Sequence, residues 1–316
     1  LILLKKKDIK LIDEKYKLSP DETKGYINEF YKYSQPLFIY SLIGLICGLA
    51  DRWLLQMFSG SVEQGLYSFA FKISAVVFLF TGSMTPLFIR EFSIAYKENN
   101  FLKMRKLFRT IIPQFYFITV FIAVFIFLNG EQLVILIGGD EYQKAGTAFT
   151  IMAFYPVHQT YGQLSGSVYY ATGKTKLYRN IGILTSILGL LVTFLLIAPK
   201  EFGGLQLAST GLALKTVLIQ FIGVNLQLWF NVKFLKLSFF KFFSHQFVIL
   251  FILLLAGYLT QFLTKYFLSS DVLILFLSGI LYSFVVFIIV LSYPKLIFMD
   301  RSTFISYFNQ LKKKLF

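Results

Sequence analysis

Residues 246–264 read QFVILFILLLAGYLTQFLT, and residues 273–293 read LILFLSGILYSFVVFIIVLSY. Neither stretch contains an acidic or basic residue, and a helix needs about 20 apolar residues to cross roughly 30 Å of hydrocarbon. The rest of the chain shares this character, since 56% of its 316 residues are hydrophobic, 15% are charged and the mean hydropathy is +0.67. Soluble domains contain about 25% charged residues. The composition therefore excludes a soluble enzyme and a disordered chain.

Similar apolar runs elsewhere predict six more membrane spans. The predicted fold class is an all-α, polytopic integral membrane protein with eight transmembrane helices, at roughly 36–57, 66–90, 110–128, 147–171, 180–198, 207–232, 246–264 and 273–293. The last two spans lack the charged residues and most of the amides found in the first six. We therefore expect a C-terminal six-helix transport lobe at 36–232 with an appended helix pair.

The flanking segments complete the expected domain organisation. Residues 1–35 are predicted to form a cytoplasmic linker with a surface helix at 20–33, because Ser19 and Glu22 have the spacing of a capping box. Residues 233–316 are predicted to hold an interfacial segment, two lipid-facing helices and a basic cytoplasmic tail. Because the chain opens on the apolar residues 1–4 and not on Met, we expect it to be a fragment that lacks an N-terminal part.

The net charge of +15 is distributed unevenly along the chain. Lys and Arg number 25 in the segments 1–35, 90–109, 174–179, 233–241 and 295–314. The loops that alternate with these segments along the chain, at 58–65, 129–146, 199–206 and 265–272, hold only Lys144, Lys200 and Lys265. Basic residues concentrate in cytoplasmic loops of membrane proteins. This bias predicts that both ends face the cytoplasm and that membrane lipids, not nucleic acid, are partners of the basic segments.

Sequence motifs give little support to an enzyme. Gly173-Lys174-Thr175 lacks the earlier glycine of a phosphate-binding loop, and His158 and His245 have no metal-ligand spacing. Cys47 is the single cysteine and lies in an apolar run. We therefore expect no catalytic residue, no metal site and no cofactor.

Charged residues inside the predicted spans are the informative ones. A charge in the middle of a membrane is costly and usually faces a cavity or a partner. Asp51 and Lys72 are equally far from the centre of the turn between the first two spans, so we expect them to form an ion pair that leaves Arg52 unmatched. The group is predicted either to bind an anionic substrate or to fix helix packing only.

Two further spans carry polar residues suited to a cavity. Lys215 lies in the sixth span on a polar side with Thr216 and Gln220, where binding and packing roles remain equally open. The fourth span contains Pro156, His158 and Gln159, which predicts a kinked helix beside the cavity. His158 could also be a packed core histidine. The candidate substrate-binding residues are Arg52, Lys72, Asp51, Lys215, His158 and Gln159.

These residues also carry a family resemblance. The stretches 51–55 (DRWLL) and 65–72 (GLYSFAFK) resemble spans of Wzx-type polysaccharide-repeat-unit flippases, of the multidrug/oligosaccharidyl-lipid/polysaccharide exporter superfamily. The stretches 139–142, 171–176 and 203–205 fit the same family, and the resemblance covers most of residues 1–232.

The resemblance implies a protein of the bacterial cytoplasmic membrane with two six-helix lobes, of which this chain is the second. It implies translocation of a polyprenyl-pyrophosphate-linked oligosaccharide by alternating access, with Arg52, Lys72 and Lys215 attracting its acidic groups and with the missing N-terminal lobe as partner. Alternatives are a lipid II flippase or drug exporter of the same superfamily, a membrane glycan polymerase, or a scaffolding subunit.

Overall fold

The computed structural model describes residues 19–299, and this part of the chain is helical and contains no strand. The predicted span end at 1–4 and the basic tail at 300–316 lie outside these residues. The elements are α2 (Pro20–Val76), α3 (Phe78–Lys97), α4 (Phe101–Leu128), α5 (Gly130–Gly138), η1 (Asp140–Ala145), α6 (Gly146–Met152), α7 (Tyr155–Ala171), α8 (Thr175–Ile197), η2 (Lys200–Phe202), α9 (Ala208–Leu235), α10 (Phe239–Phe267), α11 (Asp271–Ser292) and η3 (Pro294–Ile297).

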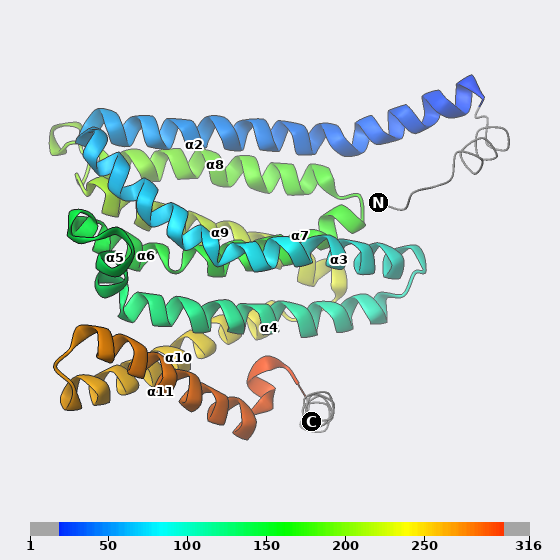
Figure 1. Ribbon diagram of the computed structural model, residues 1–316. Coiled ribbons are helices and arrows are strands. Elements are labelled where there is room, and N and C mark those ends of the chain that lie inside the picture. The colour runs from blue at the N-terminus through cyan, green and yellow to red at the C-terminus, as the bar shows by residue number, and fades with distance from the viewer. Residues whose placement is uncertain (1–18, 300–316) are drawn as a thin grey trace, which may run out of the picture.

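The helices run roughly parallel to one another in a stack (Figure 1). α2 packs along α8 at one edge, α7, α9 and α4 follow, and the α10–α11 pair forms the opposite edge. The starts of α2 and η3 lie at the same end of the bundle, whereas the bend inside α2, α5 and η2 lie at the other end. The two sets of loops thus separate as the predicted alternation requires.

Six of the described helices are long and apolar enough to cross a membrane: α2, α4, α8, α9, α10 and α11. The chain is therefore a helical membrane protein by length and composition. The other two predicted spans are divided between elements, since 66–90 falls on α2 and α3, and 147–171 falls on α6 and α7. The predicted kink is confirmed, because the helix breaks between Met152 and Tyr155, beside Pro156.

The start of α2 follows the predicted local signal. The Ser19 backbone N–H donates to Glu22 Oε2 at 2.8 Å, and the Glu22 N–H donates to Ser19 Oγ at 3.2 Å, so the capping box is present. The helix then continues through Pro36 into the first predicted span. Residues 20–33 are therefore an extension of a long helix, and no break lies at the predicted boundary after residue 35.

The chain reverses direction at Gly60, inside α2 (Figure 1). Gly60 has φ 86° and ψ 172°, in the positive-φ region that glycine adopts without a steric penalty. Two apolar cores flank the central helices. One joins α2, α6 and α9 through Leu55, Phe149 and Leu212, and the other joins α4, α7, α9 and α10.

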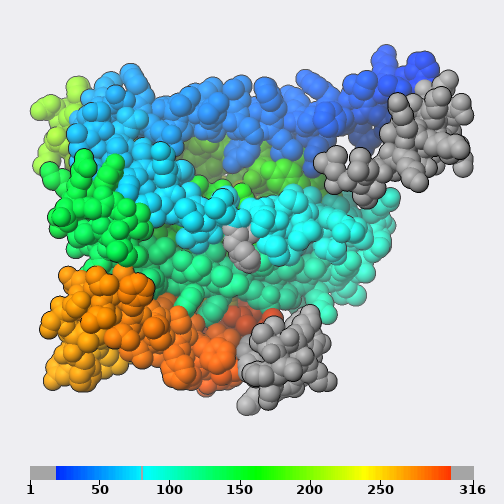
Figure 2. Space-filling model, in the orientation of Figure 1, coloured from blue at the N-terminus to red at the C-terminus, as the bar shows by residue number. Residues whose placement is uncertain are grey.

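The appended pair packs on the lobe through α4. α10 contacts α4 through buried residues such as Phe242 and Leu253, and the Tyr282 ring of α11 stacks on Phe121 at 4.9 Å between centroids. Figure 2 shows the pair as a separate block at one edge of the molecule. Large apolar side chains such as Phe251 and Phe284 remain exposed on it, as expected for helices that face lipid.

Candidate functional site

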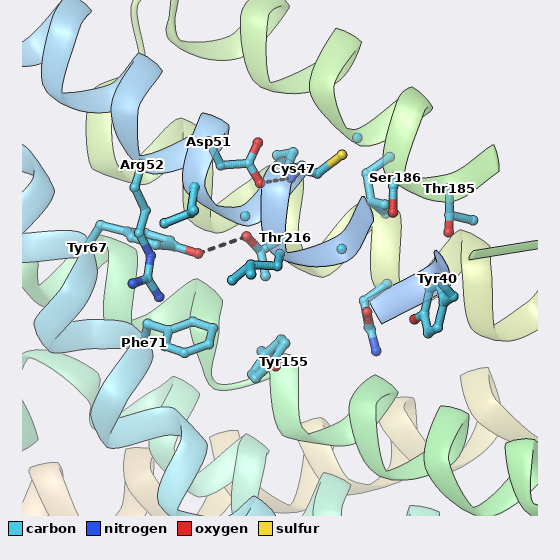
Figure 3. Close-up of a pocket in the computed structure, with 18 residues that line it drawn as sticks. Tyr40, Cys47, Asp51, Arg52, Tyr67, Phe71, Tyr155, Thr185, Ser186 and Thr216 are labelled. Carbon is cyan, nitrogen blue, oxygen red and sulfur yellow. Dashed lines mark hydrogen bonds and ion pairs between the residues drawn. The ribbon is translucent and has the colours of Figure 1, made fainter. Parts of the chain in front are cut away.

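A cavity of about 440 Å³ lies between α2, α8 and α9, with Tyr155 of α7 at its edge (Figure 3). Both arms of α2 contribute to its wall. Asp51 and Arg52 precede the reversal at Gly60, and Tyr67 and Phe71 follow it. The cavity therefore depends on the positive-φ glycine turn, which folds the second arm of α2 back across the first.

Asp51 is held by two other helices. Its Oδ2 forms an ion pair with Lys215 Nζ of α9, and its Oδ1 accepts a hydrogen bond from Thr193 Oγ1 of α8 at 2.6 Å. The Lys215 and Asp51 side chains are only 11% and 14% exposed. Gly189 leaves room for the lysine, since a Cβ at this position would lie 3.1 Å from Lys215 Cε. The pair is thus built into the contact of three helices and neutralises both charges.

The predicted pairing of Asp51 with Lys72 is wrong. The turn is centred on Gly60 and not between residues 61 and 62, so Asp51 lies nine residues before it and Lys72 twelve residues after it. Lys72 therefore lies three residues, or roughly 4.5 Å, beyond the position on its helix that is level with Asp51. Its side chain also projects from a different side of the helix than the side chain at that position. Lys72 is exposed and does not line the cavity.

Arg52 is nevertheless a cavity-lining cation without a carboxylate partner among the described residues, as predicted. It lines the cavity, is exposed, and forms no ion pair with any described residue. Its Cζ lies 5.7 Å from the centroid of the Phe71 ring, a cation–π contact that holds the guanidinium over the cavity wall (Figure 3). The N–H donors of this planar group are suited to binding oxyanions.

Aromatic side chains of the wall could not be identified from the charges in the sequence. Tyr67 Oη and Thr216 Oγ1 share a hydrogen bond of 3.1 Å, and the Phe71 and Tyr155 rings lie 5.2 Å apart. Tyr40 lies at the far side of the cavity (Figure 3). The spacing of Tyr67 and Phe71, one helical turn apart, was a usable signal, because residues at this spacing share a helix face.

Polar and small residues of α8 were missed as well. Thr185, Ser186 and Gly189 line the cavity, and Thr193 donates a hydrogen bond to Asp51. They recur every three or four residues along an otherwise apolar helix, so they share one face. This periodicity marks the side of α8 that faces α2 and α9.

The two remaining predicted residues have different surroundings. Gln159 accepts a hydrogen bond from Gln220 Nε2. Gln220 lines the cavity and Gln159 does not, so Gln159 contacts the cavity wall only through Gln220. His158 lines a second cavity of about 260 Å³ between α4, α7, α9 and α10. Its ring packs 5.2 Å from that of Phe221, on another face of α9. His158 is therefore buried apart from the first cavity, and its Nδ1 has no hydrogen-bond partner among the described residues.

The cavity wall carries groups that can bind an anion. The described residues contain no group of three His, Cys, Asp or Glu side chains that could hold a metal ion. The cavity instead offers the guanidinium of Arg52, aromatic rings and several hydroxyl and amide groups. Such a wall can hold an anionic group beside hydroxyl-rich moieties.

Sequence comparison gives one informative relative. The chain is 25% identical over 182 residues to the capsular polysaccharide biosynthesis protein CapF of Staphylococcus aureus. The matched region covers 58% of this chain and 46% of that protein, so it spans less than half of the relative. No protein-family model matches the chain, and no solved structure matches it.

Proposed function

We propose that this chain is one lobe of a transporter that moves a polyprenyl-pyrophosphate-linked polysaccharide repeat unit across the bacterial cytoplasmic membrane. The similarity to CapF supports a membrane protein of polysaccharide biosynthesis. The Wzx-type resemblance of residues 51–72 supports the flippase within that class. The alternation of lysine-poor and lysine-rich loops supports cytoplasmic ends for this lobe.

The observation that carries the proposal is the unpaired Arg52 in a cavity between apolar helices, where no described carboxylate pairs with it. A cation within a membrane-spanning segment is unfavourable unless it meets an anion or water. Asp51 does not neutralise it, because this carboxylate is occupied by Lys215 and Thr193. A pyrophosphate or an acidic sugar supplies the missing negative charge, and the guanidinium fork matches its oxygens.

Alternating access needs a second wall for the cavity. Leu45 and Leu49 lie on the cavity side of α2 and are 60% and 58% exposed. We expect the preceding lobe of the intact protein to face these residues, so that the two lobes enclose the headgroup while the lipid tail stays in the membrane. Opening the lobes toward each side in turn then requires no covalent step.

The competing transport and enzyme functions have less support. A drug–cation exporter would use a free intramembrane carboxylate, whereas Asp51 already binds a lysine and a threonine. A glycan polymerase would need convergent acidic, histidine or arginine side chains near one acceptor. Among the described residues, the charged ones that line the cavity are Asp51, Arg52 and Lys215, and two of them neutralise each other.

The cellular test uses the intact protein with a matched control. Arg52→Gln is expected to reduce surface glycan strongly at normal membrane abundance. Lys72→Gln removes a charge from the same helix, but outside the cavity, and is expected to leave glycan output unchanged. Normal glycan output from Arg52→Gln at normal abundance would contradict the proposal.

A further inference from the structure

A second pocket lies at the other end of α2, about 600 Å³ in volume and separate from the transport cavity. One wall is the start of α2, and the other is the connection between α7 and α8, at residues 173–176. Tyr33 ties the two walls together, since its Oη donates to the backbone carbonyl of Tyr170 at 3.1 Å. The pocket is therefore a defined feature of the fold, and the transport proposal does not use it.

The pocket has two cationic side chains that form no ion pair with a described residue. Lys32 of α2 and Lys176 of α8 line opposite walls, and both are exposed. Glu29 also lines the pocket and is likewise unpaired among the residues that the structure describes. The neighbouring Lys174 is engaged elsewhere, because its Nζ lies 3.3 Å from the centroid of the Phe234 ring. The pocket thus keeps a net positive charge without it.

From the predicted span starts we expect both lysines at the depth of the lipid phosphates. The first predicted span begins at residue 36, four residues after Lys32. The fifth begins at residue 180, four residues after Lys176. At 1.5 Å per residue this places both about 6 Å outside the hydrocarbon. The headgroup layer on each side of a bilayer is roughly 5–7 Å thick.

The remaining wall suits the membrane interface. The rings of Tyr26, Phe30 and Tyr33 line the pocket, and aromatic side chains of this kind concentrate at the headgroup level of membranes. Phe30 is 71% exposed, so its ring can reach lipid. α8 also begins at Thr175 without a side-chain cap, so no capping side chain satisfies its first N–H groups.

We propose that this pocket binds the phosphate of an anionic membrane lipid. Lys32 and Lys176 hold the phosphate from two sides, and the aromatic rings contact the first carbons of the lipid. The phosphate comes from a bulk phospholipid such as phosphatidylglycerol or from a polyprenyl phosphate carrier. In either case the bound lipid links the start of α2 to the start of α8, the two helices that form the transport cavity further along.

Native mass spectrometry of the intact purified protein tests the site. The protein in detergent is titrated separately with phosphatidylglycerol, polyprenyl phosphate, phosphatidylcholine and inorganic phosphate. The site variant is Lys32→Gln/Lys176→Gln. The control is Lys24→Gln/Lys106→Gln, which removes two exposed lysines outside the pocket. Lys32→Arg/Lys176→Arg keeps the charges, and the melting temperature of each variant checks its fold.

The site variant is expected to bind anionic lipid roughly 25-fold more weakly, at about 5-fold for each lysine. The control and the arginine variant are expected to bind as the unchanged protein does. Loss for phosphatidylglycerol indicates a bulk-lipid site, and loss for polyprenyl phosphate alone indicates a carrier site. Equal loss in the control, equally tight binding of phosphatidylcholine, or displacement of lipid by millimolar inorganic phosphate would overturn the proposal.

Discussion

Lys215 of α9 forms an ion pair with Asp51 of α2 across 164 positions of sequence, inside helices that are apolar enough to span a membrane. Within this contact the charges of Asp51 and Lys215 neutralise each other, so Arg52 is the cavity-lining charge that has no partner among the described residues. The pair therefore determines both the packing of α2 on α9 and the charge of the cavity.

Removing one partner of this pair is expected to destabilise the protein. Asp51→Asn leaves Lys215 without its carboxylate, and breaking a buried pair in this way costs about 3 kcal/mol. The double variant Asp51→Asn/Lys215→Met removes both charges and is expected to regain most of that loss. The melting temperatures of the purified intact protein and its variants measure this. A double variant whose loss of stability equals the summed losses of Asp51→Asn and Lys215→Met, each measured alone, would contradict the role of the pair.

Much of the local structure could be predicted from the sequence. The capping box at Ser19, the break beside Pro156 and the apolar helices depend on neighbours in sequence, and the structure has all of them. The partner of Asp51 could not be predicted in the same way. An error of one to two residues in the centre of the turn was enough to select Lys72, because each residue rotates a helical side chain by about 100°.

The cavity wall was predicted only in part, for the same physical reason. Charges within apolar spans identified Asp51, Arg52 and Lys215, since burying them requires a partner or a cavity. Aromatic residues such as Tyr67 and Phe71 are common in any membrane helix and carry no such requirement. Their place in the wall follows from the direction of the second arm of α2, which a single glycine sets.

Close packing of α2 on α8 is expected to depend on Gly182. A Cβ at this position would overlap Cε2 of the Tyr40 ring, and a bulky ring cannot move away easily. Gly182→Ala is expected to lower stability by about 1–3 kcal/mol, the usual effect of overpacking. Thermal unfolding of the intact protein measures the change.

Gly44→Ala is the matched control for this substitution. Gly44 lies in α2, and no described atom of a neighbouring residue lies within 4 Å of the position that a Cβ would take, so alanine meets no obstacle there. We expect unchanged or slightly raised stability, because alanine favours helix more than glycine does. Equal destabilisation by both substitutions would contradict the specific contact with Tyr40.

The start of α2 is expected to respond to acid. Hydrogen bonds from the backbone N–H and the side chain of Ser19 hold the pKa of Glu22 below its ordinary value of 4.5. A lowered pKa means that the carboxylate form is favoured in the folded helix, so the cap is intact above pH 4.5 and is lost as the pH falls through the lowered pKa.

Hydrogen exchange of the amides at residues 19 and 21–23 between about pH 3 and about pH 6 measures this change, after correction for the intrinsic pH dependence of exchange. Protection is expected to fall toward the acid end in the unchanged protein and to be independent of pH in Glu22→Gln, because the neutral amide oxygen still accepts from the Ser19 N–H and does not titrate. Protection that stays constant with pH in the unchanged protein would show that the Glu22 carboxylate does not support the cap.

The most direct test of the transport account is translocation of a lipid-linked oligosaccharide by the intact protein in proteoliposomes. We predict that Arg52→Gln lowers the rate at least roughly tenfold, since a charged hydrogen bond contributes about 1.5–3 kcal/mol. Lys72→Gln, reconstituted at the same density, is expected to transport as the unchanged protein does. Equal rates for Arg52→Gln and the unchanged protein would contradict the central role of Arg52.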